Sequence, residues 1–302
     1  MDQASLALLE LGRALARDGY RFVTPTPETH RRVVARRGEA RDLRDVFGWS
    51  LPFAPALLPP ALLALLREAN AVVDEGARLR AKVRFSTLAE RLYVHSAYPT
   101  LDAESVFFGP DTYRFCAFIA RSAPRAARVV DIGCGSGAGG LVAAHAAGAS
   151  ELVLADVNTR ALTLARVNAA LAGVDAELLQ SDVLAGVEGE FDLIVANPPY
   201  MRDEAARVYR DGGGAYGEAL SVRIVRESLA RLRPGGTLLL YTGVAIVDGR
   251  DVFYEAARAL LAGCETTYEE LDPDVFGEEL ERPGYERVER IAAVGLRVQT
   301  RV

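Results

Sequence analysis

The feature that most constrains the fold of this chain lies in its last two thirds. There, short apolar runs alternate with segments of helical pattern. The apolar runs predict strands near residues 128–132, 151–155, 176–180, 191–196 and 236–242. Two later runs, near 265–271 and 290–298, predict an antiparallel pair. Strands that alternate with helices build a doubly wound, mainly parallel sheet. We therefore expect an α/β domain with a seven-stranded, Rossmann-like sheet and a ligand at the carboxyl ends of its strands.

A glycine-rich loop, Asp131-Ile-Gly-Cys-Gly-Ser-Gly137, follows the first of these strands and precedes a helix expected to begin near Gly140. Its glycines let a ligand approach the backbone closely; they are Gly133, Gly135 and Gly137. The loop also fits the G-x-G-x-x-G pattern of dinucleotide sites. Asp131 argues against a dinucleotide, because a carboxylate repels a pyrophosphate. It favours a ligand with an ammonium group and no phosphate, such as S-adenosylmethionine.

Two further acidic residues follow the next strands. Asp156 ends the second strand about 20 residues after the loop, the spacing at which an acid reaches ribose hydroxyls. Asp182 follows the third strand and is placed to meet an adenine amino group, with Val183 packing against the ring. Aspartate also caps helix N-termini, which is the structural alternative for both acids.

The tetrapeptide Asn197-Pro198-Pro199-Tyr200 directly follows the fourth predicted strand. The Asn197 side-chain oxygen and the Pro198 carbonyl could accept the two N–H groups of a planar amide or amino nitrogen, while Pro199 stiffens the turn and Tyr200 offers an aromatic face. Such a turn would orient a weakly nucleophilic nitrogen toward a methyl donor. The alternative is a turn that only ends a strand. Together with the glycine loop, the tetrapeptide predicts N-methyl transfer from S-adenosylmethionine.

The segment from Ser105 to Tyr241 resembles the class I S-adenosylmethionine-dependent methyltransferases, and within them the HemK/PrmC-like group. Three stretches carry the resemblance: Asn197–Tyr200, Phe107–Tyr113 and Arg210–Gly217. The resemblance implies methylation of a glutamine side chain in a release-factor-like protein, and a helical N-terminal domain that recruits the substrate.

The chain departs from the pattern of this group at three positions. Gly109 stands where the group has arginine, Tyr113 replaces an acid, and Ala215 stands near the place of an aspartate. The same Asn-Pro-Pro-aromatic turn also serves enzymes that methylate exocyclic amino groups of adenine or guanine in RNA or DNA. A nucleobase therefore remains the alternative substrate to protein glutamine.

Composition fits such an enzyme. Of 302 residues, 50% are hydrophobic and 25% charged, which is ordinary for a globular protein. No apolar run reaches the roughly 20 residues that span a bilayer, and the N-terminus lacks a basic signal region. The three cysteines and three histidines are scattered, so no metal site is expected. A cytoplasmic location is the default expectation, with no membrane partner.

The N-terminal third is expected to form a separate domain, residues 1–100, with the methyltransferase domain at 101–302. Helices are predicted at 5–18, 27–37 and 60–75, and a hairpin at 81–96. This third holds 15 basic and 11 acidic residues, whereas the remainder holds 20 and 30. Arginines between Arg31 and Arg44 could meet phosphates or an acidic protein surface, or could be a solvated helix face.

Two stretches and two other functions stay open. The acidic insertion at 272–285 could be a lid beside the site or an ordinary surface loop, and the run 211–214 a substrate loop or a linker. A dinucleotide-dependent oxidoreductase is disfavoured by Asp131 and by the lack of a Tyr-x-x-x-Lys pair, since Lys82 is the only lysine. A non-catalytic scaffold is disfavoured by the intact tetrapeptide. The balance of charge favours a protein substrate over RNA.

Overall fold

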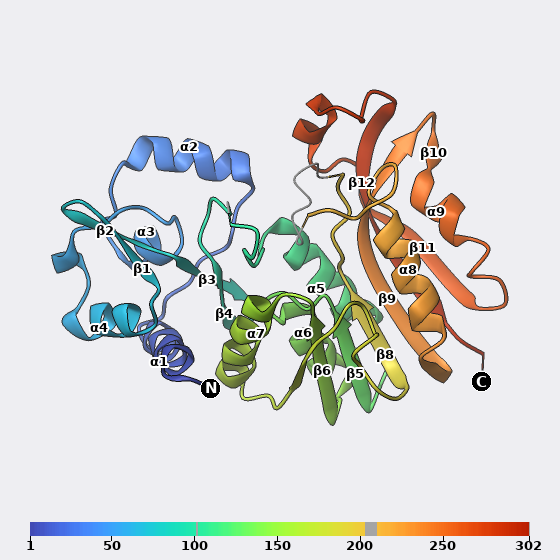
Figure 1. The fold of residues 1–302 in the computed structure, drawn as a ribbon, viewed down its shortest axis with the longest axis horizontal. Coiled ribbons are helices and arrows are strands. Elements are labelled where there is room, and N and C mark those ends of the chain that lie inside the picture. The colour runs from blue at the N-terminus through green and yellow to red at the C-terminus, as the bar shows by residue number, and fades with distance from the viewer. Residues whose placement is uncertain (101, 203–209, 302) are drawn as a thin grey trace. The chain divides into compact units, whose positions relative to one another are not determined.

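The computed structural model describes residues 1–100, 102–202 and 210–301, and it divides into two compact units (Figure 1). The first unit contains residues 1–113, 135–138 and 160–175. The second unit contains residues 114–134, 139–159 and 176–302. Leu101, at which the second predicted domain begins, lies outside the described residues. Each unit has an apolar core of its own.

The first unit combines short helices with two antiparallel hairpins. Its elements are α1 (Gln3–Arg17), α2 (Pro27–Arg37), α3 (Leu43–Phe47), η1 (Pro55–Leu57), α4 (Pro60–Glu68), β1 (Val72–Glu75), β2 (Arg78–Ala81), β3 (Val83–Leu88) and β4 (Arg91–Ser96). The helix predicted at 27–37 is confirmed as α2. Its first turn is capped by the Thr26 hydroxyl, which accepts the N–H of Thr29, and Gly38 follows its last residue at a φ of 73°.

The helix predicted at 60–75 is wrong in its second half. Helix α4 ends at Glu68, and Asn70 adopts a left-handed φ of 51°. The N–H of Ala71 then donates to the carbonyl of Leu66, which closes the helix end. Beyond this cap the β-branched pair Val72-Val73 begins the β1–β2 hairpin.

Helix α7 (Thr159–Ala172) packs with the first unit although it follows a strand of the second. Its residues Ala161, Leu164 and Val167 belong to the apolar core of the first unit. Asn168, which is 1% exposed, accepts the N–H of Val94 at 2.7 Å and donates to the Val94 carbonyl at 2.9 Å and to that of Ser136 at 2.8 Å. The helix is thus tied to strand β4 through a fully satisfied amide.

The second unit is built on a mainly parallel sheet, as predicted. Its strands run in the order β11-β12-β9-β8-β5-β6-β7. Their bounds are β5 (Arg128–Ile132), β6 (Glu151–Asp156), β7 (Glu177–Gln180), β8 (Phe191–Ala196), β9 (Leu232–Val247), β11 (Glu265–Asp272) and β12 (Val288–Gln299). The two-residue strand β10 (Arg250–Asp251) pairs with β9, so the sheet has eight strands rather than the seven expected. Two residues carry no periodicity, which is why the sequence did not predict β10.

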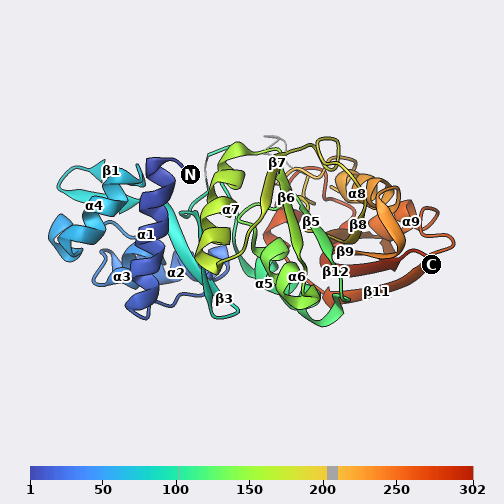
Figure 2. The same ribbon diagram turned by 90° about the horizontal axis from the view of Figure 1, so that it is seen from below.

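Helices cover both faces of this sheet (Figures 1 and 2). On one face α8 (Ala219–Leu229) and α9 (Val252–Ala257) contribute Ile224, Val225 and Phe253 to the core. On the other lie α5 (Pro110–Ser122) and α6 (Ala138–Ala147), with Phe115 of α5 against Tyr241 of β9 at 6.2 Å between ring centroids. The antiparallel pairing predicted for the last two strands is confirmed between β11 and β12.

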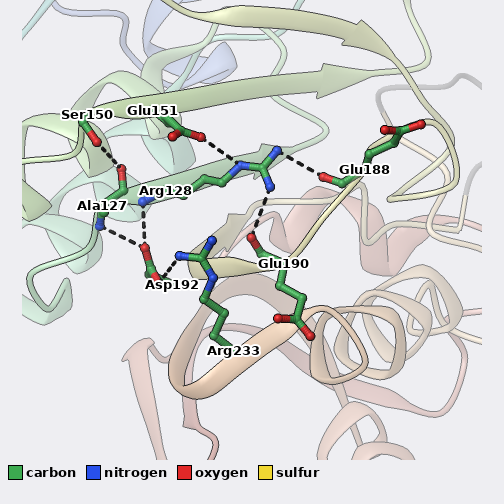
Figure 3. A network of polar contacts seen from close by, with 8 residues as sticks. All are labelled: Ala127, Arg128, Ser150, Glu151, Glu188, Glu190, Asp192 and Arg233. Atoms are coloured by element: carbon green, nitrogen blue, oxygen red, sulfur yellow. Dashed lines mark hydrogen bonds and ion pairs between the residues drawn. The ribbon is translucent and has the colours of Figure 1, made fainter.

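A polar network joins the amino ends of β5 and β8 (Figure 3). The Asp192 carboxylate accepts the N–H groups of Ala127 and Arg128 at 3.0 and 2.8 Å, and an N–H of Arg233 at 2.8 Å. The Arg128 guanidinium lies 4.6 Å from the centre of the Phe191 ring. Burial raises the pKa of Asp192, but these hydrogen bonds outweigh burial and hold the pKa below its usual 3.8.

Replacing Asp192 by alanine should lower the free energy of unfolding by about 1–3 kcal/mol, because the exposed N–H of Ala127 and the partly buried N–H of Arg128 lose a charged acceptor. The contribution is present above pH 3.8 and is lost as the pH falls through the lower pKa of the folded state. Denaturant unfolding at neutral and acid pH measures both effects. Glu10→Ala is the control, since its exposed pair with Arg13 contributes little. Equal destabilisation by the two variants would contradict the prediction.

Candidate functional site

The predicted site residues of the second unit lie at one edge of its sheet. Strand β5 pairs in parallel with β8 on one side and with β6 on the other, so their carboxyl ends are neighbours. The chain continues from β5 through β6 to β7 in one direction and then returns to β8 on the opposite side. A ligand site is expected at such a switch point. Asn197 and the glycine loop flank it, and Asp156 and Asp182 follow along the same edge.

The glycines of the loop serve two physical purposes. Gly133, Gly135 and Gly137 adopt φ values of 66°, 53° and 78°, which side chains of L-residues rarely tolerate. Gly140 instead allows α6 to approach the sheet, since a Cβ there would lie 2.5 Å from Leu154 Cδ2 and 2.9 Å from Asp131 Cβ. The helix begins at Ala138, close to the expected Gly140.

Asp131 lies beneath the loop, 1% exposed, and its carboxylate accepts the N–H of Gly140 at 2.7 Å. Burial raises its pKa to about 8, although the hydrogen bond from Gly140 acts in the opposite direction. The carboxyl group is therefore poised to ionise near neutral pH when a cation approaches. Neighbouring Cys134 is also buried, and burial raises its thiol pKa well above the usual value, which suits a packing residue rather than a nucleophile.

The two acids expected to meet the nucleoside differ in their surroundings. Asp156 is 8% exposed and accepts the N–H of Asn158 at 2.9 Å, in a turn before α7 begins at Thr159. Asp182 has a well-exposed carboxylate, held by Arg223 of α8 at 2.9 and 3.0 Å. An adenine amino group would have to share that carboxylate with Arg223, a partner the sequence did not predict.

Val183, expected to pack against the adenine ring, is 6% exposed and adopts a left-handed φ of 53°. For a β-branched residue such a φ is a strained conformation. The turn around Val183 is held by Ser181, whose hydroxyl donates to the Val183 carbonyl at 2.9 Å and accepts the N–H of Gly186 at the same distance. The hydrogen bonds of Ser181 thus hold Val183 in a backbone conformation that valine alone would not favour.

The Asn197–Tyr200 turn leaves the end of β8 with one side-chain atom unsatisfied. The Asn197 Oδ1 atom is buried and has no hydrogen-bond partner among the residues that the structure describes. A buried acceptor without a donor costs free energy. Pro198 is buried, and Pro199 is partly so. An amide oxygen kept bare at this edge of the sheet can accept an N–H from a ligand.

The Tyr200 ring is packed into the second unit. It lies on Gly243 of β9, where a Cβ would be 2.2 Å from Tyr200 Cε2, and 6.1 Å from the ring of Phe276 at an angle of 63°. Tyr200 is 8% exposed. Glycine at position 243 is therefore required by the aromatic ring of the turn, a dependence that no local sequence signal predicts.

The glycine-rich segment 210–217 packs against the Asn197–Tyr200 turn. Met201 pairs with Asp211, and the N–H of Gly212 donates to the Met201 carbonyl at 2.9 Å. A Cβ on Gly217 would lie 2.1 Å from the Tyr200 carbonyl oxygen. Ala215, in this segment, donates its N–H to Glu218 at 3.3 Å. For the stretch 211–214, these contacts favour a segment that is tied to the Asn197–Tyr200 turn over a simple linker.

The acidic insertion also touches the turn, through its aromatic residues. Phe276 and the 3-10 helix η2 (Gly277–Glu281) precede Tyr285, whose hydroxyl accepts the N–H of Arg202 at 2.9 Å. Glu279 is 2% exposed and pairs with Arg210 and, at 2.9 Å, with Arg282. At least two acids of the insertion are thus paired with arginines, since Asp272 contacts Arg114 at 2.7 Å.

Two of the departures from the family pattern are structural in the first unit. A Cβ on Gly109 would lie 2.5 Å from Phe107 Cζ, so a larger residue there would require the exposed Phe107 ring to shift. The Tyr113 hydroxyl accepts the N–H of Thr24 at 3.1 Å. Of the six arginines between Arg31 and Arg44, three contact acids through their side chains: Arg31 and Arg32 contact Glu28, and Arg37 contacts Asp45.

Within the described residues, no group of three or more His, Cys, Asp or Glu side chains could hold a metal ion. In the same part of the chain, no helix combines the length and apolar character that crossing a membrane requires.

Residues 117–246 match the family described as "Methyltransferase small domain". The release factor glutamine methyltransferase of Deinococcus radiodurans is 38% identical over 162 residues, which cover 50% of this chain and 55% of the relative. Ribosomal RNA small subunit methyltransferase C of Sodalis glossinidius is 35% identical over 115 residues, covering 38% of this chain and 30% of the relative. The chain thus spans about half, or less, of the curated relatives it matches.

Solved structures agree on the fold. The structure of wild-type Trm5b from Pyrococcus abyssi has a TM-score of 0.52 and 14% identity, covering 81% of this chain and 72% of that one. TYW2 of M. jannaschii, solved in complex with AdoMet, has a TM-score of 0.50 and 12% identity, covering 73% and 87%. The family match and the release factor relatives support the resemblance seen in the sequence: residues 117–246 form a methyltransferase domain, and over about half of its length the chain is similar to release factor glutamine methyltransferases.

Proposed function

We propose that the chain transfers a methyl group from S-adenosylmethionine to a planar amide or amino nitrogen of a macromolecule, most favourably a glutamine side chain of a release-factor-like protein. The observation that carries the proposal is the buried, unpartnered Oδ1 of Asn197 at the switch point of the sheet. That oxygen and the Pro198 carbonyl accept the two N–H groups of the substrate. The nitrogen lone pair is then aimed at the methyl group.

S-adenosylmethionine, when bound, would supply a methyl group whose carbon bonds to the substrate nitrogen as its bond to sulfur breaks, which leaves a neutral thioether. The nitrogen would lose one proton to solvent water. The roles of this chain are to bind, orient and polarise. Gly133, Gly135 and Gly137 give backbone access to the methionine part of the cofactor, Asp131 meets its ammonium group, and Asp156 meets the ribose. Asp182 and Val183 border the adenine.

Protein glutamine is favoured over RNA for two reasons. The release factor relatives match more of this chain than the ribosomal RNA relatives do. Three of the four arginines of α2 (Arg31, Arg32 and Arg37) contact Glu28 or Asp45, which leaves fewer cations for phosphates. Residues 1–100 recruit the protein substrate. Methylation of an adenine or guanine amino group in ribosomal RNA is the second candidate, because curated relatives with that name share this domain.

Tritium from labelled S-adenosylmethionine, added with the purified chain to a host-cell extract, tests the choice of substrate. We expect label in a protein fraction that resists nuclease and is lost on proteolysis. Label that disappears on ribonuclease treatment would replace the protein substrate by RNA and leave methyl transfer intact. Absence of label in every macromolecular fraction would contradict both candidates.

Asp131→Asn should separate cofactor binding from stability. The variant keeps an oxygen acceptor for Gly140 but cannot ionise, so S-adenosylmethionine should bind more weakly by about 1.5–3 kcal/mol. Because folding raises the pKa of Asp131 to about 8, the folded wild type loses stability as the pH rises from 3.8 toward 8. The variant avoids this loss and should be more stable at pH 8, by at least about 1 kcal/mol.

Calorimetry with the cofactor and denaturant unfolding at pH 6 and pH 8 measure the two effects. Asp131→Ala is the matched variant, since it also removes the acceptor for Gly140 and should lack the stability gain. Unchanged cofactor affinity in Asp131→Asn would place the ammonium group elsewhere.

A further inference from the structure

The first unit contains a recess with a buried arginine that no part of the proposed methyl transfer uses. The recess is small, with a cavity volume of about 30 Å³, and it is open to solvent on one side. Arg84 lines it together with His30, His95, Tyr98, Phe107 and Phe108. Arg84 is 3% exposed. All these residues belong to the first unit.

The Arg84 guanidinium has neutral partners only. Its Nε donates to the Gly48 carbonyl at 2.6 Å, and its Nη2 lies 2.9 Å from His30 Nδ1. Its carbon lies 5.5 Å from the centre of the Phe22 ring and 5.7 Å from that of Tyr98. No carboxylate among the described residues pairs with it. A buried cation without an anion is costly, and most proteins pair it.

The surroundings keep this cation charged and in place. Burial lowers the pKa of Arg84, but only to about 10, so the side chain is protonated at neutral pH. Burial and the charge of Arg84 lower the pKa of His30 to about 4, so its ring is neutral and can accept the arginine N–H. His95 is held by Ser86 at 2.8 Å and stacks on Phe108 at 4.8 Å. The guanidinium of Arg84 is therefore held in place in a recess that is lined by aromatic rings and by Pro25, Pro27 and Pro110.

We propose that this recess binds a single carboxylate end-on, with the guanidinium of Arg84 as its charged partner. The planar fork of arginine matches the geometry of a carboxylate. A phosphodiester is flanked by sugars on both sides and is bound along exposed basic surfaces, whereas a carboxylate on a short apolar stem fits a recess with proline and aromatic walls. The carboxylate comes from an acidic side chain of a protein or from a small free acid. The inference does not rest on methyl transfer.

Trp49 gives a direct optical test, because it is the only tryptophan and its ring stacks on His30 at 5.6 Å. The full chain without cofactor is titrated at constant ionic strength with propionate, with the uncharged isostere propionamide, and with inorganic phosphate. We expect a saturable change in Trp49 emission with propionate, and affinity at least about tenfold lower for propionamide. Equal response to propionate and propionamide, or response to phosphate alone, would overturn the proposal.

Three variants assign the effect to the recess. Arg84→Met keeps the length of the side chain and removes its charge, and should lower propionate affinity at least about tenfold. Phe107 lines the recess and is 37% exposed. Its variants keep Arg84 in place, so they test the proposal even if Arg84→Met does not fold. Phe107→Glu places a carboxylate at the site and should weaken propionate, whereas Phe107→Gln should weaken it less. Equal affinity in the two Phe107 variants would contradict the proposal.

The source of the carboxylate is distinguished by peptides. Acetyl-Gly-Glu-Gly-amide is compared with acetyl-Gly-Gln-Gly-amide by the same emission change. Binding of the glutamate peptide at least as tight as propionate supports a protein side chain. Binding of propionate but not of the glutamate peptide supports a small free acid. Equal binding of the two peptides, with no preference for the charged one, would argue against the carboxylate site.

Discussion

Replacing Asn197 by alanine is expected to reduce methyl transfer at least about 100-fold while leaving S-adenosylmethionine affinity and the free energy of unfolding nearly unchanged. The Oδ1 atom of Asn197 is buried and makes no hydrogen bond to the described part of the chain, so its removal breaks no contact of the folded protein. What is lost is the acceptor that orients the substrate nitrogen. Tritium transfer, calorimetry and denaturant unfolding measure the three quantities.

Asn168→Ala is the matched control, because its buried amide makes three hydrogen bonds to the backbone of the first unit. That variant should lower the free energy of unfolding by about 2–3 kcal/mol, at about 1 kcal/mol for each bond. An Asn197→Ala protein as unstable as Asn168→Ala would make the tetrapeptide a structural turn. Loss of cofactor binding in parallel with turnover would point the same way.

The sheet could be predicted because each of its inner strands is a short apolar run between turn signals. Strand β8 was predicted residue for residue, since Phe191–Ala196 is buried on both faces and ends at the Asn-Pro-Pro turn. Strand β9 extends to Val247, well past the predicted 242. Its last residues pair with β10 and β12, and such long-range pairing is invisible in a local pattern.

The first unit was less predictable, because its boundaries depend on contacts between distant segments. Helix α7 has the sequence of an ordinary crossover helix, yet its core-facing side packs with the N-terminal residues. The stop of α4 depends on Asn70 in a left-handed conformation, which asparagine adopts more readily than most residues. The valines that follow continue an apolar pattern that a helix or a strand can use equally well.

The position of the candidate site residues in the fold was predictable, and their contacts were less so. The glycine loop, the acids and the tetrapeptide were expected at strand ends and lie there, while their roles toward a ligand stay predictions. The sequence did not show that Arg223 holds Asp182, or that Phe276 lies against Tyr200. These partners are distant in sequence and belong to no motif, so only packing brings them to the site.

Gly217→Ala is expected to reduce turnover by at least about 100-fold, although position 217 carries no functional group. Gly217 has a φ of 93°, and an added Cβ would lie 2.1 Å from the carbonyl oxygen and 2.5 Å from the carbonyl carbon of Tyr200. Backbone atoms cannot move aside as a flexible side chain can. The Asn197–Tyr200 turn must therefore shift, and a displacement of about 1 Å in a positioning group costs on the order of 100-fold in rate.

Gly213→Ala is the matched control in the same segment. Its φ of 66° carries a similar conformational cost, but an added Cβ there would meet only Ala219 Cβ, at an ordinary 3.7 Å. Both variants should lose stability through the positive φ, and Gly217→Ala should lose more because of its clash with the Tyr200 backbone. Only Gly217→Ala should lose turnover with cofactor affinity preserved. Equal turnover in the two variants would mean that the segment 210–217 does not position the turn, and that its contact with Tyr200 serves folding alone.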